Sequence, residues 1–158
     1  MRILTIHNKE DEKVLRTKTA AFEHGSLSPK EMRELIKQMR KTMADALGIG
    51  LAANQVGIAQ QFFVAECDGK LYTVFNPKID KVFGEPVEME EGCLSVPGLR
   101  GTVKRYEKVQ ISGTDHNGKK IKIKAWGLLA HIFQHETDHL NGKLYIDKAA
   151  HIEKIENT

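Results

Sequence analysis

The feature that most constrains this chain is an H-E-x-x-H pattern at residues 135–139, which lies within an apolar segment. Leucine, isoleucine and phenylalanine recur around the pattern at spacings of three, four and seven, and an Asn-Gly pair follows, so residues 128–140 are predicted to form one helix. On a helix, His135 and His139 lie about 40° apart around the axis, and both imidazoles can reach one cation. Glu136 can reach a water molecule on that cation. The pattern therefore favours a metal-dependent hydrolase over two histidines with ordinary structural roles.

Two histidines do not complete such a site, because catalytic zinc-type centres usually have three protein ligands and one open position. One common continuation of the pattern adds G-x-x-H, and this chain follows it as far as Gly142, but Tyr145 stands where the third histidine would be. The other common third ligand is a glutamate from a later helix, and the short polar segment after Asp147 leaves little chain for that helix. We therefore expect the third ligand upstream of the histidines.

The upstream candidate is one of the two cysteines of the chain. We recognise no secretory signal at the start of the sequence, so we expect a reducing compartment and no structural disulfide. Cys93 follows Gly92 and precedes a Val-Pro-Gly run, which places its thiolate in a tight turn that is open to a ligand. A free cysteine is otherwise a small buried hydrophobe. That interpretation is retained for Cys67, which sits beside an Asp-Gly turn.

Three segments together resemble the signature motifs of the peptide deformylase family. They are Gly48-Ile49-Gly50-Leu51-Ala52-Ala53-Asn54-Gln55, Glu91-Gly92-Cys93-Leu94-Ser95 and Gln134-His135-Glu136-Thr137-Asp138-His139. The segments occur in the order of the family and at compatible separations, and the similarity runs from the first predicted helix to about Asp147. Each motif alone is weak evidence, whereas the ordered set is specific.

The resemblance implies a metal site. Cys93, His135 and His139 would bind one divalent metal ion, typically ferrous iron in the cell, with zinc, nickel or cobalt as substitutes. A mixed thiolate and imidazole set does not choose among these metals by itself. A water molecule would fill the fourth position, where the metal lowers its pKa.

The resemblance also implies roles for three further residues. Glu136 would accept a proton from the attacking water and pass it to the departing amine, which is general acid–base catalysis. The carbonyl oxygen becomes negative as a tetrahedral intermediate forms. The side-chain amide of Gln55 and the backbone N–H of Leu94 would stabilise that charge.

The implied substrate is the N-formylmethionyl end of a newly made polypeptide, from which formate is released. Such a substrate requires an apolar pocket beside the metal. The substrate-binding candidates are Ile49, Gly50, Met89, Gly92, Arg100, Leu128, His131 and Ile132. Arg100 would contact the peptide backbone or its terminal carboxylate. We interpret His131 as a residue of the pocket rim, because a fourth protein ligand would close the metal site to water.

The remaining sequence predicts an α+β fold in a single domain over residues 1–158. A capping box at Ser28 opens a predicted helix over residues 29–47, and short antiparallel strands are predicted at residues 62–65, 71–75, 82–90, 106–113 and 119–125, before the C-terminal metal-binding helix. Glu91 and Arg105 form either a buried ion pair behind the cysteine segment or two solvated charges; the sequence leaves both open.

Composition narrows the partners and the location. Apolar residues make up 41% of the chain and the net charge is only +3, which is ordinary for a globular protein. No stretch approaches the roughly 20 apolar residues that cross a membrane. Four lysines at residues 119–124 alternate with isoleucines, which indicates a solvated strand face more than nucleic-acid binding. We expect a monomer with transient ribosome encounters, in the bacterial cytoplasm, or in an organelle if the source is eukaryotic.

Two other functions remain open from the sequence. A general metallopeptidase would cleave peptides that carry no formyl group. A non-catalytic module would use the metal structurally or only bind formylated N-termini. The presence of Glu136 and Gln55 disfavours the second alternative, because structural metal binding needs neither residue.

Overall fold

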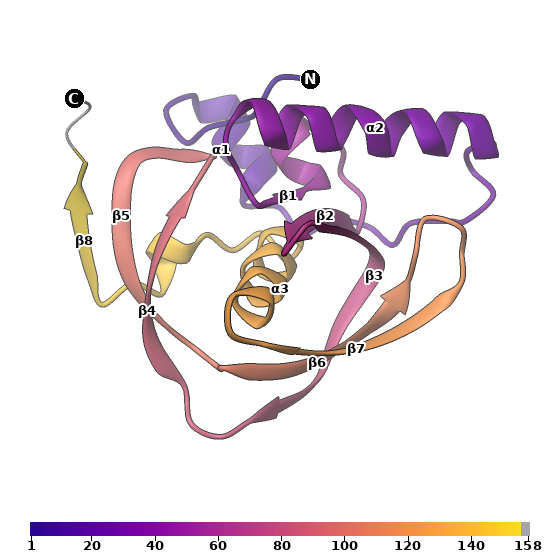
Figure 1. Ribbon diagram of the computed structural model, residues 1–158. Coiled ribbons are helices and arrows are strands. Elements are labelled where there is room, and N and C mark those ends of the chain that lie inside the picture. The colour runs from indigo at the N-terminus through magenta and orange to yellow at the C-terminus, as the bar shows by residue number, and fades with distance from the viewer. Residues whose placement is uncertain (156–158) are drawn as a thin grey trace.

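Two antiparallel sheets surround a central helix, α3, in the computed structural model of the protein (Figure 1). The structure describes residues 1–155, so residues 156–158 of the predicted domain lie outside it. The elements are α1 (Lys9–Leu15), α2 (Pro29–Asp45), β1 (Gly50–Ala52), the 3-10 helix η1 (Ala53–Val56), β2 (Phe62–Cys67), β3 (Lys70–Phe83), β4 (Val87–Cys93), β5 (Val96–Arg105), β6 (Lys108–Thr114), β7 (Lys120–Trp126), α3 (Gly127–Leu140), the 3-10 helix η2 (Tyr145–Asp147) and β8 (His151–Lys154). The predicted α+β fold class is confirmed.

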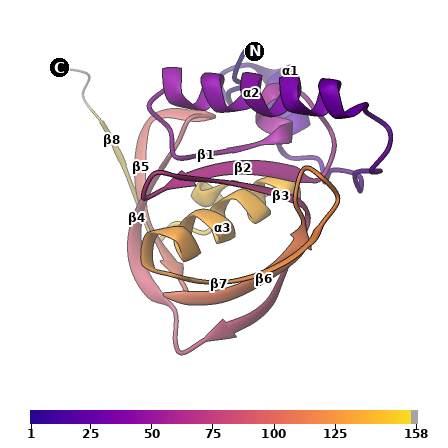
Figure 2. The same ribbon diagram turned by 45° about the vertical axis from the view of Figure 1, so that its right-hand side comes forward.

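The larger sheet, in the order β1-β2-β3-β6-β7, curves around α3 so that strands lie above and below the helix (Figures 1 and 2). The apolar side of α3 fills this curve. The ring of Phe133 lies 5.8 Å from that of Phe63 and 5.7 Å from that of Tyr72. Burial of such a face is the main driving force that holds an amphipathic helix against a sheet. This packing fixes the position of α3, the helix that carries both predicted histidine ligands.

Helix α2 covers the opposite face of β2 and β1 (Figure 1). Its capping box is present, because Ser28 Oγ accepts from the Glu31 N–H and the Glu31 carboxylate accepts from the Ser28 N–H. The predicted start at Pro29 is confirmed. The helix ends at Asp45, two residues before the predicted end, because Leu47 adopts a left-handed backbone conformation with φ of 58°. No helix within residues 1–155 is long and apolar enough to cross a membrane.

The smaller sheet, in the order β4-β5-β8, lies beside α3 and carries the cysteine segment. One prediction here is wrong: residues 82–90 do not form a single strand. Strand β3 ends at Phe83, and β4 begins at Val87. The chain turns between them through Gly84, whose φ is 72°, and Pro86, which cannot donate to a strand ladder. Strands β5 and β8 and helix α1 were not predicted.

Segments distant in the sequence hold the C-terminal end of α3. The Leu140 carbonyl accepts from both the N–H and the hydroxyl of Thr19, and the His139 carbonyl accepts from Asn54 Nδ2 at 2.6 Å. Gly142 follows with φ of 74°, and a Cβ there would lie 2.5 Å from the Arg16 carbonyl oxygen. The close approach requires glycine at this position. The last turn of α3 is therefore fixed against the N-terminal segment.

Candidate metal centre and substrate pocket

Three donor atoms meet where the end of β4 faces α3. Nε2 of His139 lies 3.2 Å from Sγ of Cys93 and 3.1 Å from Nε2 of His135, and the three donors lie within 4.8 Å of one another. Donors of a tetrahedral site, at the usual distances of about 2.1 and 2.3 Å from the ion, lie about 3.4–3.6 Å apart. The observed spacing and the thiolate–imidazole chemistry therefore fit one small divalent cation.

A tight hairpin brings the cysteine to the helix. Cys93 pairs with Val96 across a two-residue turn, and the register between β4 and β5 shifts between Glu91 and Cys93. The turn is anchored to the N-terminal segment, since the Ser95 carbonyl accepts from the Ile6 N–H at 3.0 Å. A bulge of this kind re-aims side chains next to functional sites. The predicted tight turn is therefore the β4–β5 hairpin.

The buried carboxylate of Glu91 binds the ring nitrogen of His135 that faces away from the three-donor group. Glu91 accepts hydrogen bonds from Nδ1 of His135 and Nε2 of His131, each at 2.6 Å, and from Nε and a terminal nitrogen of Arg105 at 2.6 and 3.0 Å. Burial alone would raise the pKa of Glu91, but these donors hold the pKa well below its ordinary value. The ionised carboxylate leaves Nε2 of His135 for a metal. Of the two alternatives for Glu91 and Arg105, the buried ion pair is confirmed.

The ion pair continues beyond the carboxylate. Arg105 also donates to Asp138 at 2.6 Å, and Lys148 donates to the same Asp138 oxygen at 2.8 Å. The Arg105 side chain is only 3% exposed. The network thus joins β4, β5 and the segment after η2 to α3, which carries the two histidines of the three-donor group. His131 contacts this network through Glu91 and is not part of the three-donor group.

The Glu136 carboxylate is buried against the backbone of β1. A Cβ built on Gly50 would lie 2.5 Å from Oε2 of Glu136. Among the described residues, Oε1 of Glu136 has no hydrogen-bond partner. Burial raises the pKa of Glu136 to about 7. A carboxylate with an ordinary structural role is usually paired when buried, so this one is available to a ligand.

Substitution of Gly50 by alanine should lower the hydrolytic kcat/KM about 100-fold or more, because the new methyl group would displace the Glu136 carboxylate. Steady-state kinetics with metal-saturated protein would measure the effect. Gly69→Ala is the control for a general loss of stability, because a Cβ at its φ of 76° is strained but meets no atom within 4 Å and lies outside the pocket, so this variant should keep wild-type activity. Equal activity of the Gly50→Ala protein and the wild-type protein would contradict the proposed position of the carboxylate.

Gln55 is held so that its amide nitrogen faces the cysteine. Its Oε1 accepts from the Ala52 N–H at 2.9 Å, which fixes the orientation of the amide. Its Nε2 then lies 3.1 Å from Oγ of Ser95 and 3.7 Å from Sγ of Cys93. Leu94, the other predicted donor, lies in the two-residue turn that follows Cys93. The two groups therefore border the metal centre from two different elements.

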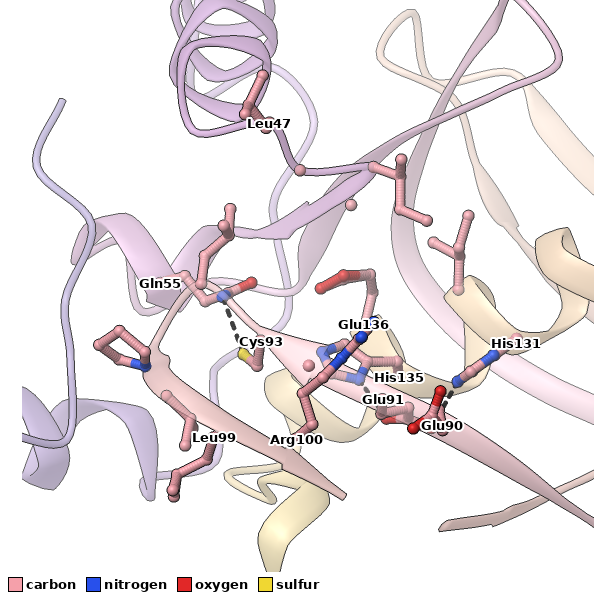
Figure 3. A pocket seen from close by; sticks show the side chains of 18 of the residues that line it. Leu47, Gln55, Glu90, Glu91, Cys93, Leu99, Arg100, His131, His135 and Glu136 are labelled. Atoms are coloured by element: carbon pink, nitrogen blue, oxygen red, sulfur yellow. Dashed lines mark hydrogen bonds and ion pairs between the residues drawn. The ribbon is translucent and has the colours of Figure 1, made fainter. Parts of the chain in front are cut away.

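A pocket of about 480 Å³ opens in front of these groups (Figure 3). It brings together predicted residues from all three motifs: Ile49, Gly50, Gln55, Gly92, Cys93, Leu94, Arg100, Leu128, His131, Ile132, His135 and Glu136. Met89 does not line it, because the contribution of β4 begins at Glu90 and Met89 pairs with Val103 further along the strand. Its assignment to the pocket is wrong.

The pocket also contains residues that the sequence did not single out. Leu47 lies at its edge after α2, and Leu99 and Ile155 lie at its edge on the smaller sheet. The only sequence feature that could have placed Leu47 near the pocket is the adjacent Gly48, which begins the first of the three motifs. For Leu99 and Ile155 the position depends on β5 and β8, which periodicity does not reveal.

A helix-borne H-E-x-x-H pattern, a strand cysteine within reach of both histidines and an adjacent buried carboxylate together define a metal-dependent hydrolase. The sequence model of the family described as polypeptide deformylase matches residues 1–155. The chain belongs to this family.

Curated relatives and solved structures agree with that assignment. The chain is 45% identical over 150 residues to a peptide deformylase of Symbiobacterium thermophilum, covering 93% of this chain and 67% of the relative. It is 42% identical to that of Thermodesulfovibrio yellowstonii, covering 98% and 93%. The crystal structure of the Thermotoga maritima peptide deformylase matches with a TM-score of 0.86 at 34% identity, covering 94% and 97%. A Synechococcus elongatus peptide deformylase in complex with actinonin matches with a TM-score of 0.86 at 39% identity, covering 96% and 79%.

Proposed function

We propose that the protein removes the formyl group from the N-terminal formylmethionine of newly made polypeptides and releases formate. The observation that carries this function is the buried Glu136 carboxylate, whose Oε1 has no hydrogen-bond partner among the described residues and which lines the pocket together with Cys93 and His135 of the three-donor cluster. Membership of the polypeptide deformylase family supports the same reaction.

Cys93, His135 and His139 would hold one divalent metal. When bound, such a metal lowers the pKa of water and polarises a carbonyl group. We infer ferrous iron as the cellular metal, with zinc, nickel or cobalt as substitutes, and the mixed thiolate and imidazole donors are compatible with all of them. The Glu91 carboxylate orients His135 through its Nδ1.

In the proposed reaction, one residue would transfer the proton and two others would stabilise the negative charge. A carboxylate oxygen of Glu136 accepts the proton of the attacking water and returns it to the departing amine nitrogen. Nε2 of Gln55 and the backbone N–H of Leu94 donate to the formyl oxygen as it becomes negative. The fixed amide of Gln55 supports this role, because its orientation needs no rearrangement during the reaction.

The pocket wall would bind the methionine side chain. Ile49, Leu128 and Ile132 give it an apolar lining, and His131 stands at its rim. Gly50 and Gly92 let the peptide backbone approach closely. Arg100, also in the lining, would contact the peptide backbone or its terminal carboxylate.

We further infer a monomer that encounters the ribosome transiently and binds no nucleic acid itself. The proposed substrates are the ends of new polypeptides, and the relatives named above are bacterial proteins. The bacterial relatives support a location in the bacterial cytoplasm.

One assay separates this function from the alternatives. The metal-loaded protein should release formate from a short formyl-Met peptide and leave the peptide bonds intact, and chelation of the metal should abolish the release. Coupled detection of formate and mass spectrometry of the peptide measure both events. Cleavage of unformylated peptides would indicate a general metallopeptidase. Binding without formate release would indicate a non-catalytic module.

A further inference from the structure

Leu47 ends helix α2 in a backbone conformation that normally belongs to glycine. The Gly48 N–H donates to the Met43 carbonyl and the Leu47 N–H donates to the Ala44 carbonyl, which together form a Schellman motif. Leu47 is the left-handed residue of this motif, with φ of 58°. A side chain with a Cβ is disfavoured in this conformation, and glycine is the usual residue. The helix end therefore does not explain the presence of leucine.

The leucine side chain is also exposed. Leu47 is 92% exposed, the largest value among the exposed large hydrophobic residues in the described part of the chain. A leucine in water gains nothing from hydrophobic burial. The isolated protein thus holds both an unfavourable backbone conformation and an unfavourable side-chain environment at one residue. Strain of this kind is typical of functional sites, where a ligand supplies the missing contact.

The position of Leu47 identifies that ligand. The residue lines the pocket in front of the metal centre, and Figure 3 shows it on one side of Gln55 and Cys93, with Leu99 and Arg100 on the other. Ile155 joins Leu99 in the lining, and the Ile155 N–H donates to the Gly98 carbonyl at 2.9 Å. Ile49 and Ile155 are themselves 47% and 44% exposed. Apolar side chains therefore lie on two opposite sides of the pocket, Leu47 on one and Leu99 on the other.

We propose that Leu47 is a specificity-determining residue that packs against an apolar side chain of the peptide downstream of formylmethionine. This inference rests on the proposed deformylase function and adds a preference to it. The leucine becomes covered only when a peptide with a large apolar residue lies in the outer part of the pocket. Peptides with glycine at the same positions leave Leu47 exposed.

The test compares three formylated tripeptides: formyl-Met-Leu-Gly, formyl-Met-Gly-Leu and formyl-Met-Gly-Gly. The wild-type holoenzyme should prefer at least one leucine peptide over the glycine peptide by about tenfold in kcat/KM. Leu47→Gly should remove most of this preference, because it should lower kcat/KM for the preferred leucine peptide about tenfold relative to kcat/KM for formyl-Met-Gly-Gly. Its melting temperature should equal that of the wild type or exceed it by up to about 4 °C, because glycine relieves the left-handed strain.

Two control variants separate substrate contact from helix capping. Leu47→Ala keeps the strained backbone but removes most of the side chain, so it should lose the preference without gaining stability. Asp68→Gly relieves another left-handed residue, with φ of 50°, outside the lining of this pocket, and it should leave the preference unchanged.

Three outcomes would overturn the inference. They are an unchanged preference in Leu47→Gly, an equal loss of activity on all three peptides, or a wild-type dimer in sedimentation that Leu47→Gly dissociates, which would mean that a second copy covers the leucine. Failure of the wild-type protein to release formate from any of the peptides would instead refute the deformylase function. The two failures are therefore distinguishable.

Discussion

Replacement of Glu136 by glutamine is expected to lower kcat/KM for formate release by about a thousandfold, with bound metal unchanged. The amide of glutamine has nearly the same shape as the carboxylate but cannot accept a proton from water at neutral pH. Loss of a positioned general base typically costs a factor of about 10² to 10⁴. Formate release measures the rate, and elemental analysis of the purified variant measures the metal.

A surface glutamate provides the control for this substitution. Glu88 lies on β4 and is exposed, so Glu88→Gln makes the same chemical change away from the metal centre. It should retain wild-type activity. A Glu136→Gln protein with wild-type activity would remove the proposed base, and one without metal would show that Glu136 supports the ligands instead.

Substitution of Arg105 by leucine should lower the free energy of unfolding by about 3–5 kcal/mol, because it leaves the Glu91 and Asp138 carboxylates without their shared cation in the interior. The Arg105 and Glu91 side chains are 3% and 2% exposed, so water does not replace the lost charge. Urea unfolding in the presence of excess chelator would measure the change without a contribution from metal binding.

Arg40→Leu is the matched control. Arg40 also pairs with a glutamate, Glu66, but these side chains are 51% and 31% exposed. Exposed pairs contribute about 1 kcal/mol or less. Similar losses in the two variants would mean that the Arg105 network is no more important for stability than a surface ion pair.

The elements that local sequence predicts are those with strong periodicity. The apolar stripe and the capping box predicted α2 and the residue at which it starts. The apolar pattern around the two histidines predicted α3. Strand β5 was not predicted because Pro97, Gly98 and Gly101 interrupt its pattern, and β8 because all its residues are exposed. In both cases the partner strand creates the element, and a single sequence does not show that partner.

The metal centre was predictable because its motifs carry unusual residue types at fixed spacings. The predicted convergence of Cys93 with both histidines agrees with the structure. The extension of the ion pair from Arg105 to Asp138 and Lys148 was not predictable, because these residues meet only through tertiary packing. Met89 was wrongly placed in the pocket because the sequence does not reveal where along β4 the pocket begins.

The attachment of the end of α3 to the N-terminal segment has a consequence for dynamics. Isolated helix ends fray rapidly, but here the carbonyls of His139 and Leu140 are bound by Asn54 and Thr19, and Gly142 lies against the Arg16 backbone. Local opening near His139 therefore requires both η1 and the N-terminal segment to detach from the helix. Amide hydrogens in this turn should exchange as slowly as those of the central strands, and escape of a bound cation should be governed by the same cooperative opening.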